Sequence, residues 1–336
     1  KMQIFCHGNK SLKLKKIHAF TIKIFRFLVD NQEDKFTLLH YDIIRLDLII
    51  YRKLKLLALG GFMKKTAFFA IAVLAAFSAF ADNFSIGFTP AGNVSSYTKT
   101  NYSVTSKFGE YFRSVSEKEV HKFSNGLETE YSLLNAKDEL ITKTTNNYDA
   151  KKLVSFIYSD IANSAELKTE YEYGVDSKIK SYTVTETDSG NLSSKTIFKY
   201  EGKKLTENHY DKDGKLYLRV IQTLNDDGIP VQETEYNGDG TFSLSRSYSF
   251  TESKKIAAIE TFDEEGNCTN KVAFRYDAND FLTEIQVYEN GKITERRIYK
   301  NDALGNPVRI SYYDVAEKFG TTVNELSRIE DFSYSY

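Results

Sequence analysis

The sequence predicts an all-β protein, a serial antiparallel β-hairpin meander of about 16 strands that is curled or folded over into an elongated repeat sheet. Aromatic residues recur at short intervals nearly to the C-terminus, and most are followed by a segment rich in Asp, Asn and Gly and then by an aliphatic residue. From Tyr210 the interval alternates between 14 and 12 residues until the last two steps, so the repeated unit is two strands long. The recurring positions are Phe123, Leu134, Tyr148, Tyr158, Tyr173, Thr187, Tyr200, Tyr210, Leu224, Tyr236, Phe250, Phe262, Tyr276, Tyr288, Tyr299 and Tyr313.

The polar segments between these positions are predicted to be β-turns. Three of them lie in Tyr210–Leu216, Tyr236–Phe242 and Phe262–Cys268, and each combines Asp or Asn with Gly. Asp and Asn tolerate left-handed backbone angles and bond their own main chain, while Gly adopts positive φ without steric cost. The chain is therefore expected to reverse direction at each segment.

Between the turns the side chains alternate with a period of two, as in a strand that is buried on one side. In Phe242–Phe250 the apolar residues and Arg246 share one face, and serines take the other. In six strands the first and the last residue are separated by an even number of positions, so both point to the same face. This regularity predicts one continuous apolar face. We interpret the aromatic residues as core and not as a ligand-stacking strip. Four apolar residues fall on the face that is expected to be polar: Ile259, Ile285, Val287 and Ile298. Either some strands are covered on both faces, or the sheet curls.

Two segments resemble known bacterial repeat families. Asp302–Asp314 resembles the YD repeat of Rhs-type and wall-associated proteins, with its Tyr-Asp, its Gly-Asn turn and its return to Tyr. Tyr288–Ile293 resembles the variant MORN repeat, in which an aromatic residue precedes Asn-Gly-Lys and an aliphatic residue. Both families build serial antiparallel hairpins, so the resemblance implies an all-β architecture and brings no catalytic residue with it.

The N-terminal part contains an export signal at an unusual position. Met63 and two lysines precede an apolar run that ends in Ser78-Ala79-Phe80-Ala81, which is the pattern of a secretory signal peptide cleaved between Ala81 and Asp82, with Ala79 and Ala81 as the small residues. A transmembrane anchor is the rival interpretation, but the run is shorter than the roughly 20 residues that span a bilayer. The residue after the cleavage site is not a cysteine, so we expect no lipid anchor.

Five segments are expected along the chain. Residues 1–62 lack the repeat and precede the signal, so we interpret them as upstream DNA translated in error; a genuine basic extension is the alternative. The signal peptide occupies 63–81. Residues 82–122 read as an N-terminal off-period β region, 123–313 as the hairpin repeat domain, and 314–336 as a C-terminal cap and last strand.

Charge and cysteine content exclude some classes of function. The chain has a net charge of -1, but removal of residues 1–81 leaves a mature protein of about -10. Such an acidic chain repels phosphate backbones, so nucleic-acid binding is not expected. Cys268 is the one mature cysteine, predicted to be a buried inert thiol because it opens a strand. We expect an exported protein, periplasmic or extracellular.

No residue pattern points to catalysis, to a cofactor or to a metal. His121 and His209 lie on different predicted strands and are expected to be exposed, and Glu233 and Glu235 are expected to mark a solvated face. The turn acids do not match the EF-hand pattern, so turn chemistry accounts for them without calcium. These acids are Asp211, Asp213, Asp226, Asp227 and Asp239.

The resulting functional hypothesis is an exported, non-enzymatic repeat protein that presents a β surface to an unidentified envelope protein or glycan. One alternative is an outer-membrane β-barrel, because the alternating aromatics of Phe332–Tyr336 look like the C-terminal signal of such barrels. Charges on both faces of Ile293–Tyr299 count against it. A less favoured alternative is an envelope-acting hydrolase with a site in 82–122.

Overall fold

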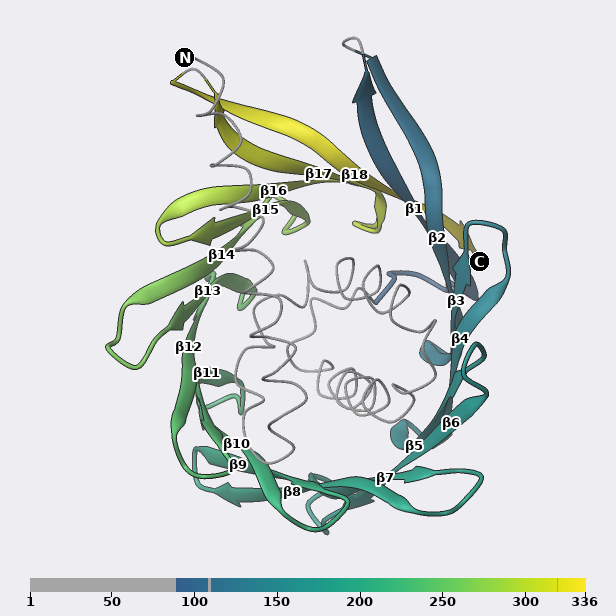
Figure 1. Ribbon diagram of the computed structural model, residues 1–336, viewed down its shortest axis with the longest axis vertical. Coiled ribbons are helices and arrows are strands. Elements are labelled where there is room, and N and C mark those ends of the chain that lie inside the picture. Colours follow the sequence, from purple (N-terminus) through teal and green to yellow (C-terminus); the bar gives the residue numbers. More distant parts are fainter. Residues whose placement is uncertain (1–88, 108–109, 319) are drawn as a thin grey trace, which may run out of the picture. The chain divides into compact units, whose positions relative to one another are not determined.

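The computed structural model describes residues 89–107, 110–318 and 320–336, which belong to one compact unit. These residues form 18 β-strands (Figure 1). The strands are β1 (Ser96–Lys107), β2 (Glu110–Ser124), β3 (Leu127–Asn135), β4 (Leu140–Asp149), β5 (Lys152–Asp160), β6 (Ala165–Tyr173), β7 (Ile179–Glu186), β8 (Leu192–Glu201), β9 (Lys204–Asp211), β10 (Leu216–Leu224), β11 (Pro230–Asn237), β12 (Phe242–Phe250), β13 (Ile256–Phe262), β14 (Cys268–Tyr276), β15 (Leu282–Glu289), β16 (Lys292–Asn301), β17 (Pro307–Lys318) and β18 (Thr321–Ser335).

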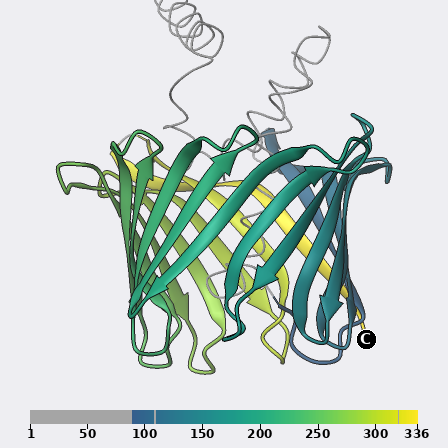
Figure 2. The same cartoon turned by 90° about the horizontal axis from the view of Figure 1, so that it is seen from below.

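The sheet closes on itself. Each strand pairs antiparallel with the next, and β1 also pairs antiparallel with β18, from Ser96 opposite Ser335 to Ser103 opposite Arg328. Figure 1 shows the resulting ring, and Figure 2 shows its strands inclined to the barrel axis. The predicted fold class, an open or folded-over meander, is therefore wrong although the all-β hairpins are present. Closure is favourable because it pairs the two edges that an open sheet would leave exposed.

The turns form as their residues predict. In the β9–β10 turn, Asp211 Oδ1 accepts hydrogen bonds from the backbone N–H groups of Asp213 (3.0 Å) and Lys215 (2.9 Å). Gly214 has a φ of 76°, the left-handed conformation that favours glycine. In the β16–β17 turn, Asp302 Oδ1 accepts the corresponding hydrogen bonds from the backbone N–H groups of Leu304 and Asn306. In the β13–β14 turn, hydrogen bonds from Asn267 hold the pKa of the Asp263 carboxyl below its usual range.

The apolar residues do not form one continuous face by simple parity. The ladders between β11 and β16 each shift register by one residue beside the turn, for example at Glu235/Tyr236 and at Thr261/Phe262. Such a shift inserts an unpaired residue. The other alternate set of side chains in the next strand then points to this face. As a result Ile259 and Ile285, which the sequence pattern assigns to the opposite face, join the same side as Arg246.

We call this side the inner face and define it by Leu244, Arg246 and Tyr248 of β12; residues directly opposite in neighbouring strands continue it around the ring. Side chains converge on the concave side of a closed sheet and are crowded there. The largest fully buried strand side chains all lie on this side, so it faces the lumen; they are Leu167, Thr169, Val184, Thr196 and Ile285.

Two hairpins are longer than the others. The β1–β2 and β17–β18 pairs continue past the point where β1 and β18 stop pairing, and Figure 1 shows them diverging from the ring. Residues 314–318 continue β17 as a strand, in the part of the chain where the sequence predicted a C-terminal cap. The start of β1 and the end of β18 lie at one rim, since the Ser95 amide donates to the Ser335 carbonyl oxygen at 2.8 Å.

Across residues 89–107, 110–318 and 320–336, no helix combines the length and the hydropathy that crossing a membrane requires.

Candidate functional site: the inner face of the barrel

The ring is too wide for its own inward side chains to fill. With strands about 4.8 Å apart, 18 strands form a backbone ring roughly 30 Å across. In barrels of 16–18 strands the inward side chains leave an aqueous channel. The chemistry of the inner face therefore decides what this lumen accepts.

One charged patch of the inner face spans β9 to β12. Arg246 Nη1 donates to Glu233 Oε1 at 2.5 Å and to Glu235 Oε1 at 2.6 Å. Glu207 lies on the same face as Glu235, because both are directly opposite Val220. All three carboxylates are buried, with side-chain exposures of 4–11%. We call this the β9–β12 patch.

His209 belongs to the β9–β12 patch. Its Nδ1 lies 2.9 Å from the Thr196 hydroxyl, and its Nε2 lies 3.5 Å from Glu207 Oε2 without making a hydrogen bond. The ring is buried, with 7% of its side chain exposed. The patch thus contains three carboxylates, one guanidinium and an imidazole with an unused nitrogen.

A second charged patch spans the seam strands β18, β1 and β2. Lys99 Nζ bonds Glu119 Oε1 at 2.8 Å, and Asn101 Nδ2 donates to both Glu117 and Glu119 at 3.1 Å. Asn101 lies directly opposite Glu117 on one side and Glu330 on the other. The Oδ1 atom of Asn101 is buried and has no hydrogen-bond partner. We call this the seam patch.

Two arginines flank the seam patch. The Arg328 guanidinium lies 3.7 Å from the centre of the Tyr312 ring, and the Arg297 guanidinium lies 5.4 Å from it. Arg297 Nε also donates to Glu295 Oε1 at 2.6 Å, and Arg328 Nη2 lies 3.6 Å from Glu330. Cation–π stacking and ion pairing together fix both guanidinium groups against the wall.

An apolar cluster lies on the inner wall between the patches. The main cluster is built by β6 to β9 from Leu167, Tyr182, Val184, Phe198 and Leu205. None of these five is a recurring position that the sequence predicted to be core; two of the recurring positions, Tyr200 and Leu224, only pack against the cluster and are partly buried. The interpretation of the recurring aromatics as the core is therefore wrong. The cluster lies between the two charged patches along one side of the ring.

The outer face is polar and carries ion pairs between strands. Glu130 binds Lys122 at 2.8 Å and Lys143 at 2.7 Å. Elsewhere on this face Arg296 binds Glu284 at 2.7 Å. The outer face therefore carries charged side chains as well as the inner face.

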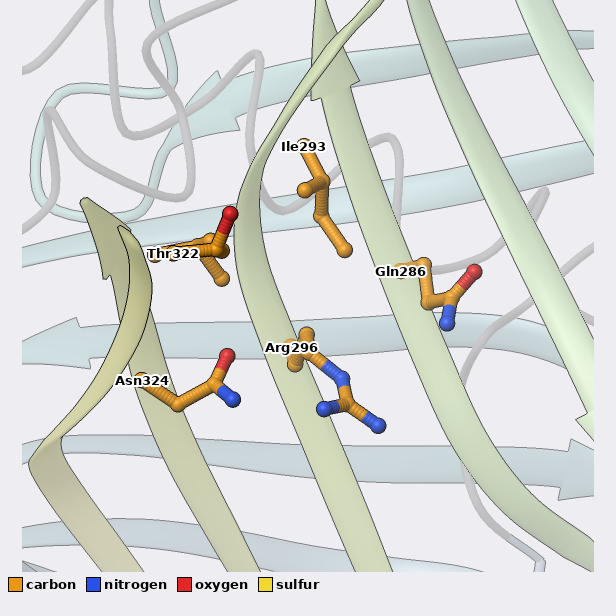
Figure 3. Close-up of a pocket in the computed structure, with 6 residues that line it drawn as sticks. Gln286, Ile293, Arg296, Thr322 and Asn324 are labelled. Carbon is orange, nitrogen blue, oxygen red and sulfur yellow. The ribbon is translucent and has the colours of Figure 1, made fainter. Parts of the chain in front are cut away.

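An outer groove of about 320 Å³ lies where the β17–β18 hairpin bends away from the ring (Figure 3). It combines side chains of β15 and β16 with side chains of the projecting hairpin, and it contains no cluster of catalytic groups. Its lining residues are Gln286, Ile293, Arg296, Val315, Thr322 and Asn324.

The structure corrects several residue assignments. His209 is buried and His121 is only 14% exposed, so neither is the exposed strand residue expected. Glu233 and Glu235 are buried ion-pair partners and not a solvated face. Cys268 is exposed, where a buried thiol was predicted; its Sγ donates to the Asn270 carbonyl oxygen at 3.4 Å.

Two other sets of predicted residues stand apart from the lumen. Asp211 and the other turn acids lie at the rims, where those that bond the backbone shape the turns. Within the described part of the chain no three His, Cys, Asp or Glu residues are arranged to hold a metal ion. The predicted cleavage residues Ala79, Ala81 and Asp82 lie outside the described residues.

The sequence contains a signal for the β9–β12 patch, although the repeat pattern alone does not reveal it. Arg246 falls on the apolar face of its strand, between Leu244 and Tyr248. A buried guanidinium requires a carboxylate partner, and Glu233 and Glu235 are the acids of the neighbouring strand. No comparable signal marks the seam patch, because β18 lies far from β1 and β2 in the sequence.

No known protein family matches the sequence, and no curated protein matches it either. Among solved structures, a porin-like protein from Bacteroides uniformis is 12% identical with a TM-score of 0.41, covering 73% of this chain and 99% of that chain. A porin-like protein from Bacteroides vulgatus is 11% identical with a TM-score of 0.31, covering 72% and 98%. At these scores the similarities say nothing about function. The resemblance to YD-repeat and variant MORN families is nevertheless wrong as an assignment, since none of them matches and the chain forms a closed barrel.

The closed ring also corrects the functional hypothesis and the expected location. The hypothesis of a protein that presents a long open β surface is wrong, because the β1–β18 ladder closes the sheet into a barrel. The periplasmic or extracellular location is overturned with it, since an antiparallel barrel of 18 strands is the architecture of outer-membrane pores.

Proposed function

We propose that this chain forms a porin-like β-barrel of the outer membrane, whose lumen gives polar solutes a passage. The observation that carries the proposal is the closed antiparallel ring of 18 strands with charged patches on its inner face. A ring of this width leaves an aqueous channel, and its charged wall favours water and polar solutes over apolar ones.

Two further features support this function. Bacterial outer-membrane barrels have an even number of antiparallel strands, which brings both chain ends to one rim. Here the start of β1 and the end of β18 meet in that way, at Ser95 and Ser335. The signal peptide predicted at 63–81 would supply the export that such a location requires.

A planar bilayer experiment tests the proposal. Protein folded in detergent is added to one side of the bilayer, and the current is recorded at fixed voltage in potassium chloride. We expect stepwise increases in conductance from the folded protein and none from heat-denatured protein or detergent alone. Folded protein that never produces steps, at any concentration that still gives folded barrels by circular dichroism, would overturn the pore.

The outer face favours a second candidate, a barrel that works in water and encloses a polar solute. An outward Arg or Lys costs about 2–4 kcal/mol at the bilayer midplane and about 0–1 kcal/mol near the interfaces. The pairs of Glu130 with Lys122 and Lys143, and of Arg296 with Glu284, would have to lie at the interfaces or bear that cost. Partition between the aqueous and detergent phases of Triton X-114 separates the candidates, since a pore enters the detergent phase and a water-soluble vessel does not.

A further inference from the structure

We propose that the lumen binds cationic solutes, of the class of organic amines, at the β9–β12 patch and the seam patch, and that it admits cations in preference to anions. The inference deepens the proposed function by naming the class of solute. It also applies to a water-soluble vessel, because it concerns the inner wall alone.

Each patch contains a carboxylate that pairs with no Lys or Arg among the described residues. In the seam patch Lys99 pairs with Glu119 and Arg328 lies beside Glu330, which leaves Glu117 with only the amide of Asn101. In the β9–β12 patch Arg246 forms ion pairs with both Glu233 and Glu235. That leaves Glu207 with only His209, at 3.5 Å.

Each patch also contains a buried polar atom that lacks a partner. Asn101 Oδ1 is unpartnered in a residue that is 4% exposed, and the residue lies between Glu117 and Glu330. His209 Nε2 is unpartnered in a side chain that is 7% exposed, beside Glu207. A buried polar atom without a hydrogen bond costs about 1–3 kcal/mol, so each patch is short of one polar group.

A cationic amine supplies what both patches lack. Its positive charge pairs with the carboxylate that has no basic partner, and its N–H groups can donate to the amide oxygen of Asn101 or to His209 Nε2 in the tautomer that accepts there. A bare metal ion fits less well, because the described residues do not bring three ligands together. The geometry therefore favours an ammonium or guanidinium group.

The two patches lie on opposite sides of the ring. Figure 1 shows β1, β2 and β18 across the barrel from β9 to β12. The apolar cluster of β6 to β9 lies between them on one side of the ring. Negative charge on facing walls of a narrow aqueous passage raises the local concentration of cations and lowers that of anions. Rings of acidic side chains select cations in this way.

Two variants and a matched control isolate the patches. Glu117→Gln and Glu207→Gln remove one negative charge each and keep the side-chain volume. Neither residue pairs with a Lys or Arg, so neither substitution leaves a buried ammonium or guanidinium group without its carboxylate. Glu170→Gln removes the same charge from the outer face, where the side chain is 52% exposed. All three proteins are first compared by circular dichroism to confirm that they fold alike.

Two measurements then test the proposal. The reversal potential in a gradient of potassium chloride gives the ratio of cation to anion permeability, and isothermal titration with spermidine gives the affinity for an organic amine. We expect a permeability ratio above one that falls about threefold in the double variant Glu117→Gln/Glu207→Gln, and a spermidine Kd that rises about tenfold, with Glu170→Gln unchanged in both.

The outcomes separate this inference from the proposed function. Conductance with no preference for cations, together with spermidine affinity equal in all variants, overturns the inference and leaves the pore standing. Spermidine binding that depends on Glu117 and Glu207 without any conductance overturns the pore and supports the inference for a water-soluble vessel. Absence of both conductance and binding overturns both.

Discussion

The phenolic hydroxyl of Tyr276 donates a hydrogen bond of 2.9 Å to the backbone carbonyl oxygen of Ile256. Tyr276 closes β14 and Ile256 opens β13, so the bond joins two successive hairpins at one rim of the barrel. Tyr148 and Tyr173 make the same contact, each to the carbonyl of the residue 20 positions earlier. The 26-residue repeat of the sequence thus corresponds to a contact between neighbouring hairpins.

The same contact corrects an expectation about packing. One continuous apolar face, as the sequence predicts, would place Tyr276 beside Phe262 and Tyr288. Those residues end β13 and β15 at the opposite rim, because consecutive turns of a meander alternate between the two ends. The neighbours of a recurring Tyr are therefore found one whole hairpin away in the sequence.

Replacement of Tyr276 by Phe removes the hydroxyl and keeps the ring. We expect the free energy of unfolding to fall by about 0.5–1.5 kcal/mol, the net value of one hydrogen bond. Urea titration followed by circular dichroism measures it. Tyr336→Phe is the control, since Tyr336 is 67% exposed, and it should change stability by less than about 0.5 kcal/mol. Equal effects of the two variants would contradict the role of the contact.

The inner and outer faces are tested by a pair of isoleucines on neighbouring strands. Ile285 of β15 is 0% exposed, and Ile298 of β16 is 36% exposed on the other face. Ile285→Ala should lower the free energy of unfolding by about 2–5 kcal/mol, because it leaves a cavity in a packed wall. Ile298→Ala should cost about 1 kcal/mol or less. The reverse order would mean that the two faces are assigned the wrong way round.

Arg246 tests the buried ion pairs of the β9–β12 patch. Arg246→Met leaves Glu233 and Glu235 without their basic partner, and we expect a loss of about 3–5 kcal/mol in the free energy of unfolding. The matched control is Lys254→Met, whose side chain is 70% exposed and pairs with Asp227 at 2.7 Å. That change should cost no more than about 1 kcal/mol.

A second step separates lost charge pairing from lost packing at Arg246. Adding Glu233→Gln and Glu235→Gln to Arg246→Met removes the uncompensated charges and should restore part of the lost stability. A triple variant as unstable as Arg246→Met, in the same urea titration, would mean that the guanidinium acts through packing alone.

Local structure could be predicted from the sequence because it depends on neighbouring residues. The limits of β12, Phe242–Phe250, and of β14, Cys268–Tyr276, coincide with the residues expected to open and close them. Turn chemistry and period-two alternation determine both. The shift of face between successive strands could not be read in this way, because the bulge that causes it is a property of two paired strands.

Ring closure depends on the most distant contact of the described chain. Ser96 pairs with Ser335, and nothing in either segment alone indicates the other as its partner. The seam patch was missed for the same reason, since Asn101 and Glu330 meet only when β1 and β18 pair. Curvature accumulates over many hairpins, so the sequence left curling, folding over and closure as open alternatives.

A disulfide across the seam tests the closed barrel most directly. Thr98 of β1 lies directly opposite Ser333 of β18, and Thr234 of β11 lies opposite Ser245 of β12 within a hairpin. Each pair is replaced by cysteines in a chain whose own Cys6 and Cys268 are changed to serine. The oxidised proteins are then examined by mass spectrometry and by non-reducing gel electrophoresis.

The closed barrel predicts that both pairs form an intramolecular disulfide to a similar extent, because both are neighbours in one continuous ladder. An open meander keeps the hairpin pair together and separates Thr98 from Ser333 by the width of the whole sheet. Efficient oxidation of the Thr234 and Ser245 pair with no intramolecular disulfide between positions 98 and 333 would contradict the barrel, and the lumen and its proposed functions with it.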